Sequence, residues 1–171
     1  TLCRFLSGIG KSTSILTRGF GGKEKGPIFV STNLHQSLDV GDEPLMMAHS
    51  LDVCVSRNRP LGANHILDKK KYDCIVMDDG LQNPTLKKDL NIAVFDGKYG
   101  IGNGFLLPAG PMRQKLEVGI QNIDLVIFNG KDETGLEQKI PPHIPIFTGE
   151  LQPDEEIVEK MKNRRVYGFA G

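Results

Sequence analysis

The chain has 171 residues, 21 of them Lys or Arg and 21 of them Asp or Glu, so its formal net charge is zero. With 39% hydrophobic and 25% charged residues, the composition excludes intrinsic disorder, which needs low hydrophobicity and high net charge. The zero net charge argues against a strongly basic nucleic-acid-binding domain, and we expect no nucleic acid partner. No apolar stretch approaches the ~18 residues of a membrane-spanning helix.

Short apolar segments rich in β-branched residues alternate with segments of helical length. The predicted strands are Ser14–Thr17, Ile28–Ser31, Val53–Ser56, Cys74–Met77, Ile92–Phe95, Leu125–Phe128, Ile144–Thr148 and Val166–Ala170. The predicted helices are Glu43–Leu51, Pro60–Lys71, Gln114–Gln121 and Asp154–Lys162. Strands that are apolar throughout are typical of burial on both faces. The alternation therefore predicts an α/β fold with a mostly parallel sheet flanked by helices.

The chain is expected to have two parts. Residues 1–129 are predicted to form a core α/β lobe for the nucleotide and the substrate. Residues 130–171 begin with a polar, proline-rich stretch and are predicted to form a connection and the start of a second α/β lobe. Because the chain opens with Thr1 and closes on a strand-like segment before Gly171, we also expect it to be part of a longer protein.

Polar residues follow most of the predicted strands. In open parallel sheets, ligands bind beyond the carboxyl ends of the strands. The residues in these positions are Arg18, Arg57 and Arg59, Asp78 and Asp79, Asp96, and Asn129. We therefore expect charged and glycine-rich residues to gather on one rim of the sheet.

The segment Ile75–Gly80, an apolar strand that ends in two aspartates, is the strongest local motif. It matches the Walker B pattern, in which a carboxylate holds Mg²⁺ beside the phosphates of a nucleotide. Two adjacent carboxylates can divide the work, one binding the metal and one a proton or hydroxyl. A simple Asp-Gly turn is the alternative interpretation.

The segment Gly8–Thr13 (GIGKST) resembles the end of a phosphate-binding P-loop, but its context differs. The first position of that motif would be Phe5 instead of glycine, and a strand, not a long helix, follows Lys11 closely. We interpret the segment as a helix end, a glycine turn and the start of a strand. We expect the P-loop itself to be absent from these residues.

Asp42 and Glu43 precede Pro44 at a predicted helix start. Such residues often cap a helix and stabilise it by ~1 kcal/mol. The alternative is that Asp42 accepts the proton of a substrate hydroxyl.

The order of several motifs is more specific than any one of them. These motifs are TRGFGG at 17–22, VGDEP at 40–44, DDGLQ at 78–82, GNGFLLPAGPMR at 102–113 and FAG at 169–171. In this order they resemble the tetraacyldisaccharide 4'-kinase family of lipid A biosynthesis over roughly residues 14–171. The resemblance implies a P-loop-kinase-like, two-lobed α/β fold.

The resemblance also implies an activity and a location. Members of this family transfer the γ-phosphoryl group of ATP, with Mg²⁺, to the 4'-hydroxyl of an acylated glucosamine disaccharide 1-phosphate. They work at the cytoplasmic face of the bacterial inner membrane, so the resemblance implies that the partners of this chain are the glycolipid and the membrane surface.

The resemblance assigns roles to individual residues. Asp42 would accept or orient the sugar hydroxyl proton, with Asp79 as its catalytic partner near the nucleotide. Asp78 would be the acid on the Mg²⁺ side, and Arg18 and Phe20 would lie near the lipid sugar. Arg59 and Arg113 would bind phosphate, because a guanidinium pairs with phosphate oxygens in a bidentate manner.

The chain also departs from the family pattern. The family often has Glu after the arginine of the GPxR segment, where this chain has Gln114, and a neutral amide is a weaker ligand for Mg²⁺. Without an upstream P-loop, we expect this chain alone to be inactive. The rival hypotheses are an inactive fragment or pseudo-enzyme with the same fold, and a P-loop-type kinase or ATPase with a soluble substrate.

Overall fold

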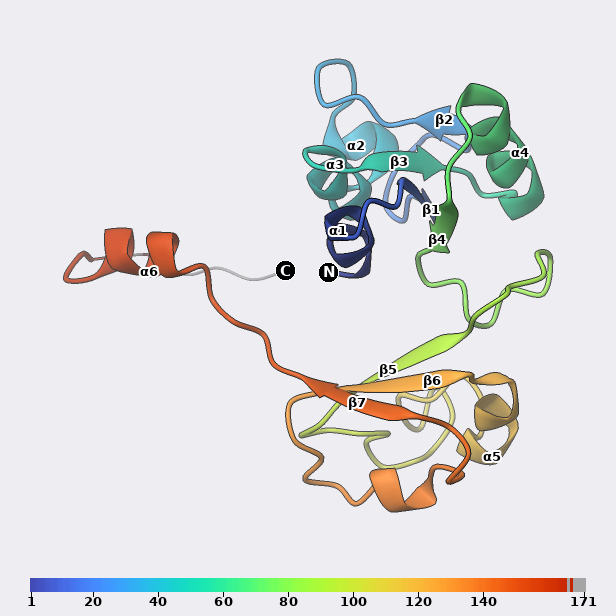
Figure 1. Cartoon of the computed structure of the whole chain (residues 1–171), viewed down its shortest axis with the longest axis vertical. Coiled ribbons are helices and arrows are strands. Elements are labelled where there is room, and N and C mark those ends of the chain that lie inside the picture. The colour runs from blue at the N-terminus through green and yellow to red at the C-terminus, as the bar shows by residue number, and fades with distance from the viewer. Residues whose placement is uncertain (166, 168–171) are drawn as a thin grey trace. The chain divides into compact units, whose positions relative to one another are not determined.

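The computed structural model describes residues 1–165 and 167 and divides into two compact units, residues 1–88 and 89–171 (Figure 1). The expected strand Val166–Ala170 and the FAG motif lie outside the described residues, apart from Tyr167. The boundary between the units falls earlier than the predicted lobe boundary after residue 129. It does so because the strands at 92–96 and 125–129 pair with each other in the second unit.

The first unit is built on a four-stranded sheet with the order β2-β3-β1-β4. Strand β1 pairs in parallel with both β3 and β4, and β2 runs antiparallel to β3. The elements of this unit are α1 (Leu2–Gly8), β1 (Thr13–Thr17), β2 (Ile28–Phe29), α2 (Ser37–Val40), α3 (Asp42–Ala48), β3 (Asp52–Val55), α4 (Arg59–Lys69) and β4 (Cys74–Met77).

Helices cover both faces of this sheet, as the apolar strands predict. On one face, Cys3 of α1 packs with Ile15 and Val53 and with partly buried residues of α3. On the other face, Ile66 of α4 packs with Leu16 and Cys54. All five residues of β1 are buried, so the central strand forms the core between the two helical layers.

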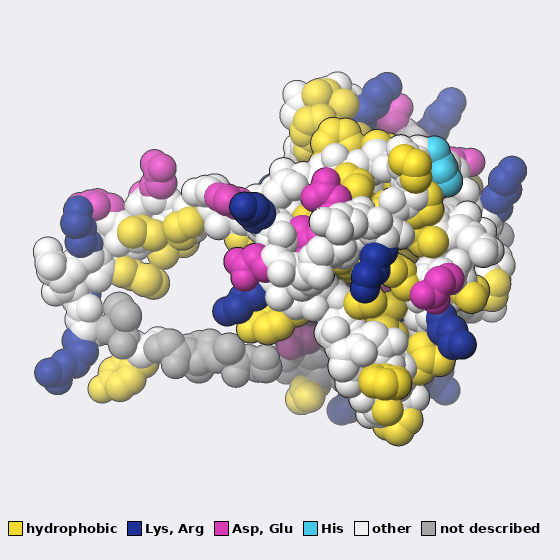
Figure 2. Space-filling view, turned by 90° about the horizontal axis from the view of Figure 1, so that it is seen from below, with side chains coloured by type: hydrophobic (Ala, Val, Ile, Leu, Met, Phe, Trp, Pro, Cys, Tyr) yellow, Lys and Arg dark blue, Asp and Glu magenta, His cyan; other side chains and the backbone are white. Residues whose placement is uncertain are grey.

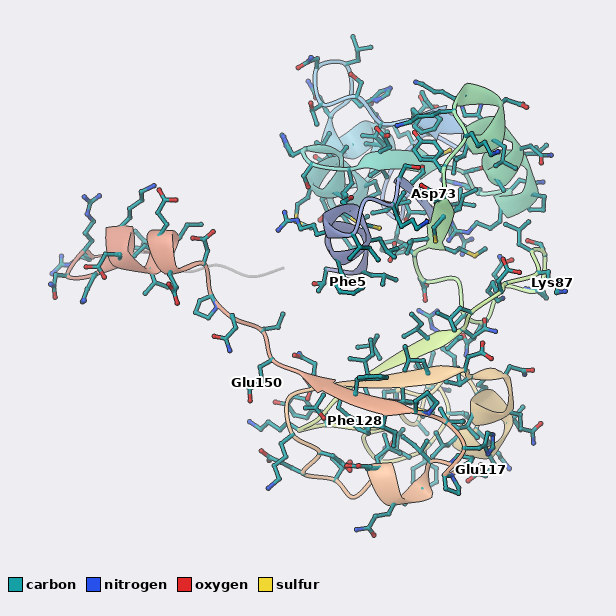
Figure 3. All side chains as sticks on the ribbon, in the orientation of Figure 1. Phe5, Asp73, Lys87, Glu117, Phe128 and Glu150 are labelled. Carbon is teal, nitrogen blue, oxygen red and sulfur yellow. The ribbon has the colours of Figure 1, made fainter. Side chains whose placement is uncertain are left out.

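The second unit has a three-stranded parallel sheet with the order β5-β6-β7. Its core gathers on one face around Phe128, which is labelled in Figure 3. The elements are β5 (Ile92–Asp96), α5 (Leu116–Gly119), the 3-10 helix η1 (Ile120–Asn122), β6 (Leu125–Asn129), the 3-10 helix η2 (Glu137–Lys139), β7 (Ile146–Gly149) and α6 (Glu155–Met161).

Helix α6 has no buried residue. Its apolar side chains Ile157, Val158 and Met161 are about half exposed, and Figure 2 shows hydrophobic and acidic side chains on different sides of this segment, at the left of the view. The Asp154 side chain caps it by accepting from the amides of Glu156 and Ile157.

The structure departs from the predicted elements at α2 and at the predicted helix Gln114–Gln121. The short helix α2 was not predicted; a capping box between Gln36 and Asp39 supports its single turn. The predicted helix Gln114–Gln121 begins two residues later, as α5, and tightens into η1. None of the helices among the described residues is both long and apolar enough to cross a bilayer.

Candidate active site at the carboxyl edge of the first sheet

The carboxyl ends of β1, β3 and β4 lie side by side in the first unit. In register, Thr17 of β1 faces Val55 of β3, and Leu16 faces Met77 of β4. The residues that follow these strands therefore meet at one edge, as predicted for Arg18, Arg59, Asp78 and Asp79. Asp96 and Asn129, which end β5 and β6, pair with each other in the second unit instead.

Asp78 is held at this edge by both its backbone and its side chain. Its amide donates to the carbonyl of Leu16 (3.0 Å), which extends the pairing of β4 with β1 by one residue. Its Oδ2 accepts a hydrogen bond from the Thr17 hydroxyl at 3.0 Å. The half-buried carboxylate thus has a fixed orientation. Sequence reasoning gave Thr17 no role, although a hydroxyl at the last position of a buried strand, directly before the ligand-binding edge, was a signal for one.

Asp79 adopts an unusual backbone conformation, with φ of +45°. This left-handed region is costly for most residues with a side chain, and Asp is among the few that tolerate it. The following carbonyl, that of Gly80, accepts from the Lys88 ammonium at 3.3 Å. Asp78 and Asp79 therefore form a constrained turn, and this turn places the Asp79 side chain on the surface.

Arg59, predicted to bind phosphate, is only 4% exposed. One guanidinium nitrogen, Nη2, donates to the carbonyl of Asp78 at 3.0 Å. Burial lowers the pKa of Arg59, while the carboxylates of Asp78 and Asp79 act in the opposite direction. An arginine retains its charge under such shifts, so a buried cation lies behind the two carboxylates.

Asp42 is the first residue of α3, and Gly41 precedes it as the N-cap. The side chain of Asp42 is exposed and accepts from the amide of Glu43 at 3.0 Å. The helix-cap interpretation is therefore only partly correct: the residue lies in the first turn, but its carboxylate does not cap the helix.

Glycines bring the start of α3 against the loop after β1. A Cβ on Gly22 would lie 2.6 Å from the carbonyl carbon of Val40, and one on Gly41 would lie 2.5 Å from the carbonyl oxygen of Phe20. Gly41 also has φ of +95°, which strongly favours glycine. This backbone contact joins two predicted motifs, TRGFGG and VGDEP, and places the residue before Asp42 against the backbone of Phe20.

Arg18 and Phe20 are both exposed, and the Phe20 side chain is 86% accessible. An exposed aromatic ring beside an exposed cation can contact the apolar and anionic parts of an amphipathic ligand.

The GIGKST segment lies at the opposite, amino end of the sheet. Helix α1 ends at Gly8, and β1 begins at Thr13, which confirms the predicted helix, turn and strand. The amide and hydroxyl of Ser12 both donate to Asp73 Oδ2 at 2.8 Å; Asp73 is labelled beside β4 in Figure 3. These bonds lower the pKa of Asp73.

A polar hollow of about 430 Å³ nearby, lined in part by His49 and Lys70, contains none of the predicted site residues.

Arg113 and Gln114 belong to the second unit, where they follow a compact loop. Within that loop, Leu107 and Met112 are joined by a backbone bond of 2.9 Å, and the Asn103 side chain donates to the carbonyl of Ala109 at 2.9 Å. Arg113 is exposed. Gln114 is half-buried. Its amide nitrogen packs against Gly119, where an added Cβ would lie 2.7 Å from Gln114 Nε2. The described residues contain no cluster of three or more His, Cys, Asp or Glu side chains suited to hold a metal ion.

Comparison with known proteins decides the family. The family described as "Tetraacyldisaccharide-1-P 4'-kinase" matches residues 1–171. The chain belongs to the tetraacyldisaccharide 4'-kinase family. The resemblance inferred from motif order is therefore confirmed.

Individual relatives agree with this assignment. The chain is 44% identical over 160 residues to the tetraacyldisaccharide 4'-kinase of Rhodospirillum rubrum, covering 91% of this chain and 48% of the relative. It is 41% identical over 162 residues to that of Gluconobacter oxydans, covering 95% and 49%. The chain thus spans about half the length of these curated relatives.

A solved structure shares the fold. It is the "apo" form of LpxK from Aquifex aeolicus in complex with ATP, with a TM-score of 0.71 and 30% identity over 86% of this chain and 46% of that one. The prediction of an α/β, P-loop-kinase-like fold with parallel sheets flanked by helices is confirmed. The roles of individual site residues stay predictions.

Proposed function

We propose that the full gene product containing this chain transfers the γ-phosphoryl group of ATP to the 4'-hydroxyl of a tetraacyldisaccharide 1-phosphate. The observation that carries the proposal is the carboxyl edge of the first sheet. There the fixed Asp78 carboxylate and Asp79 follow β4, and the loop after β1 contacts the backbone just before Asp42. Membership of the family and the complex of the Aquifex aeolicus protein with ATP support it.

Asp42 is our candidate general base. The sugar oxygen forms the new bond to the γ-phosphorus, its proton passes to Asp42, and ADP leaves with the electrons of the broken bond. Asp79 assists near the nucleotide. The exposed position of Asp42 leaves its carboxylate accessible to a substrate hydroxyl. Positioning and charge neutralisation supply most of the rate in such reactions.

Asp78 is our candidate Mg²⁺ ligand. Carboxylate oxygens are the donors that Mg²⁺ prefers, and the bond from Thr17 uses only one of the lone pairs of Asp78 Oδ2. Mg²⁺ beside a nucleotide is commonly held by one or two carboxylates together with the phosphates, so Asp78 fits the metal although the described residues contain no larger ligand cluster. Gln114, in the second unit, stays a separate candidate ligand, and its neutral amide would bind Mg²⁺ more weakly than a carboxylate. When bound, Mg²⁺ neutralises charge on the phosphates.

Arg18 and Phe20 are our candidates for binding the lipid sugar, and Arg113 for binding a phosphate. The exposure of Arg18, Phe20 and Arg113 supports these assignments. Arg59 stays a candidate substrate-binding residue, although its burial favours a role inside the first unit.

We propose that the protein binds its glycolipid substrate at the cytoplasmic face of the inner membrane and contacts the membrane surface there. We propose no nucleic acid partner. Exposed apolar side chains on the loop and helix beside Asp42, namely Phe20 and Leu38, support contact with acyl chains.

Cosedimentation with vesicles that contain the acylated disaccharide tests this contact. Phe20→Ser should reduce binding while the matched exposed change Leu67→Ser, on α4, should not; equal loss in both would contradict it.

The activity is tested by following transfer of labelled phosphate from ATP to the tetraacyldisaccharide 1-phosphate. We expect the full gene product to be active and the 171-residue chain alone to be inactive. Activity in neither would favour a pseudo-enzyme. Transfer to soluble sugars, with none to the acylated disaccharide, would favour a kinase with a soluble substrate.

A further inference from the structure

Arg59 is buried although it begins a helix that follows a strand. Arg59, Gly62 and Ile66 are the buried residues of α4, and their spacing of three and four places them on one helix face. A Cβ on Gly62 would lie 2.6 Å from Leu16 Cδ1 and 2.6 Å from Ser56 Cβ. The missing side chain allows α4 to approach β1 closely, and this close approach carries Arg59 beneath the carboxyl edge of the sheet.

The guanidinium contacts one particular peptide group. Nη2 donates to the carbonyl oxygen of Asp78, which belongs to the peptide that joins Asp78 to Asp79. Rotation of this peptide changes ψ of Asp78 and φ of Asp79 together, so the bond constrains the directions of both carboxylates. Nη1 is buried with no hydrogen-bond partner among the described residues.

The peptide that Arg59 holds is also the strained one. Asp79 has φ of +45°, a conformation that persists only where surrounding contacts impose it. The charges that act on Arg59 are the carboxylates of Asp78 and Asp79 and the guanidinium of Arg18. The attraction between Arg59 and the two carboxylates favours the same turn.

We propose that Arg59 is a positioning residue: from inside the first unit it fixes the peptide between Asp78 and Asp79 and thereby aims both carboxylates, instead of binding a phosphate of the substrate. The catalytic meaning of this role rests on the proposed function. The conformational part does not, because it concerns only residues of this chain.

The conformational part is tested on the 171-residue chain by amide hydrogen exchange and amide NMR signals. Arg59→Met, which keeps an apolar chain of similar length, should speed exchange at Asp79 and Gly80 by roughly tenfold or more and shift their signals. Arg57→Met is the matched control, because Arg57 Nη2 also donates to a carbonyl, that of Gly22, at 3.2 Å. It should leave Asp79 and Gly80 unchanged. Unchanged Asp79 and Gly80 signals in folded Arg59→Met would overturn the proposal.

If Arg59→Met does not fold, the same exchange and NMR measurements on Arg59→Lys test the proposal. Lys keeps the charge but carries its N–H donors on a single nitrogen, so a positioning role predicts a smaller shift confined to residues 78–80. Unchanged signals there would again overturn the proposal.

The catalytic part is tested in the full gene product. Arg59→Lys should lower kcat by roughly tenfold or more, with KM for ATP and for the disaccharide within about twofold of wild type. A large rise in either KM at unchanged kcat would identify Arg59 as a direct ligand and overturn the proposal. If the wild-type protein transfers no phosphate, the proposed function fails, while the exchange result still decides whether Arg59 holds the turn.

Discussion

The hydroxyl of Thr17 donates to Oδ2 of Asp78 at 3.0 Å and so links the last residue of β1 to the first residue after β4. Both residues lie at the carboxyl ends of neighbouring parallel strands, where ligands bind in open α/β folds. The orientation of the carboxylate is therefore set by the neighbouring strand as well as by its own backbone.

Removal of the Thr17 hydroxyl should weaken Mg²⁺ binding. In Thr17→Val the shape of the buried side chain is kept and the donor to Asp78 is lost, so we expect the Mg²⁺ concentration for half-maximal activity of the full gene product to rise by about tenfold. Thr17→Ser keeps the hydroxyl and serves as the control. If both variants match wild type in a Mg²⁺ titration, Asp78 does not depend on Thr17.

Gly22 should tolerate no side chain. In Gly22→Ala the new Cβ would lie within 2.6–2.7 Å of three backbone atoms of residues 39–41, which cannot move independently. We expect a loss of about 1–3 kcal/mol in the free energy of unfolding, seen as a lower midpoint in thermal unfolding followed by circular dichroism. In Gly8→Ala the new Cβ meets nothing within 4 Å, so its midpoint should stay or rise slightly. Equal midpoints in the two variants would contradict the close contact.

Tyr72 should lose its hydroxyl proton only at an unusually high pH. Burial and, next, the 2.8 Å bond that its hydroxyl donates to Asp52 raise its pKa from 10.0 to about 12. The folded state therefore binds this proton more tightly than the unfolded state. The stabilisation is complete below pH 10 and is lost as the pH rises from 10 to about 12.

Tyrosinate absorbance measures this directly. Of the three tyrosines, one should titrate with a midpoint near 12 in the folded chain, and Tyr72→Phe should remove that late step. Asp52→Asn should move it towards the ordinary value. A late step that persists in Tyr72→Phe would belong to another tyrosine.

The strands and the acidic edge were predictable because they depend on local pattern. Continuous apolar runs mark strands buried on both faces, and an aspartate directly after such a run, as at Asp78, must lie at a strand end. The exclusion of a P-loop at Lys11 was predictable for the same reason, since the strand follows too soon.

The burial of Arg59 could not be predicted, because it depends on how closely α4 approaches β1 at Gly62. The division after residue 88 could not be predicted either, because the sequence of β5 does not indicate that it pairs with β6 instead of β4. The placement of α3 against the loop after β1 could not be predicted, because it depends on the backbone contacts of Gly22 and Gly41. Sequence alone showed only that the two motifs contain glycine.

Asp42→Ala in the full gene product tests the central claim most directly, with initial rates of phosphate transfer to the tetraacyldisaccharide 1-phosphate and ATP affinity measured side by side. Loss of a general base predicts a fall in turnover of roughly 10²–10⁴-fold, with ATP affinity within about twofold of wild type. Unchanged turnover would contradict the account and leave Asp42 as an ordinary first-turn residue of α3.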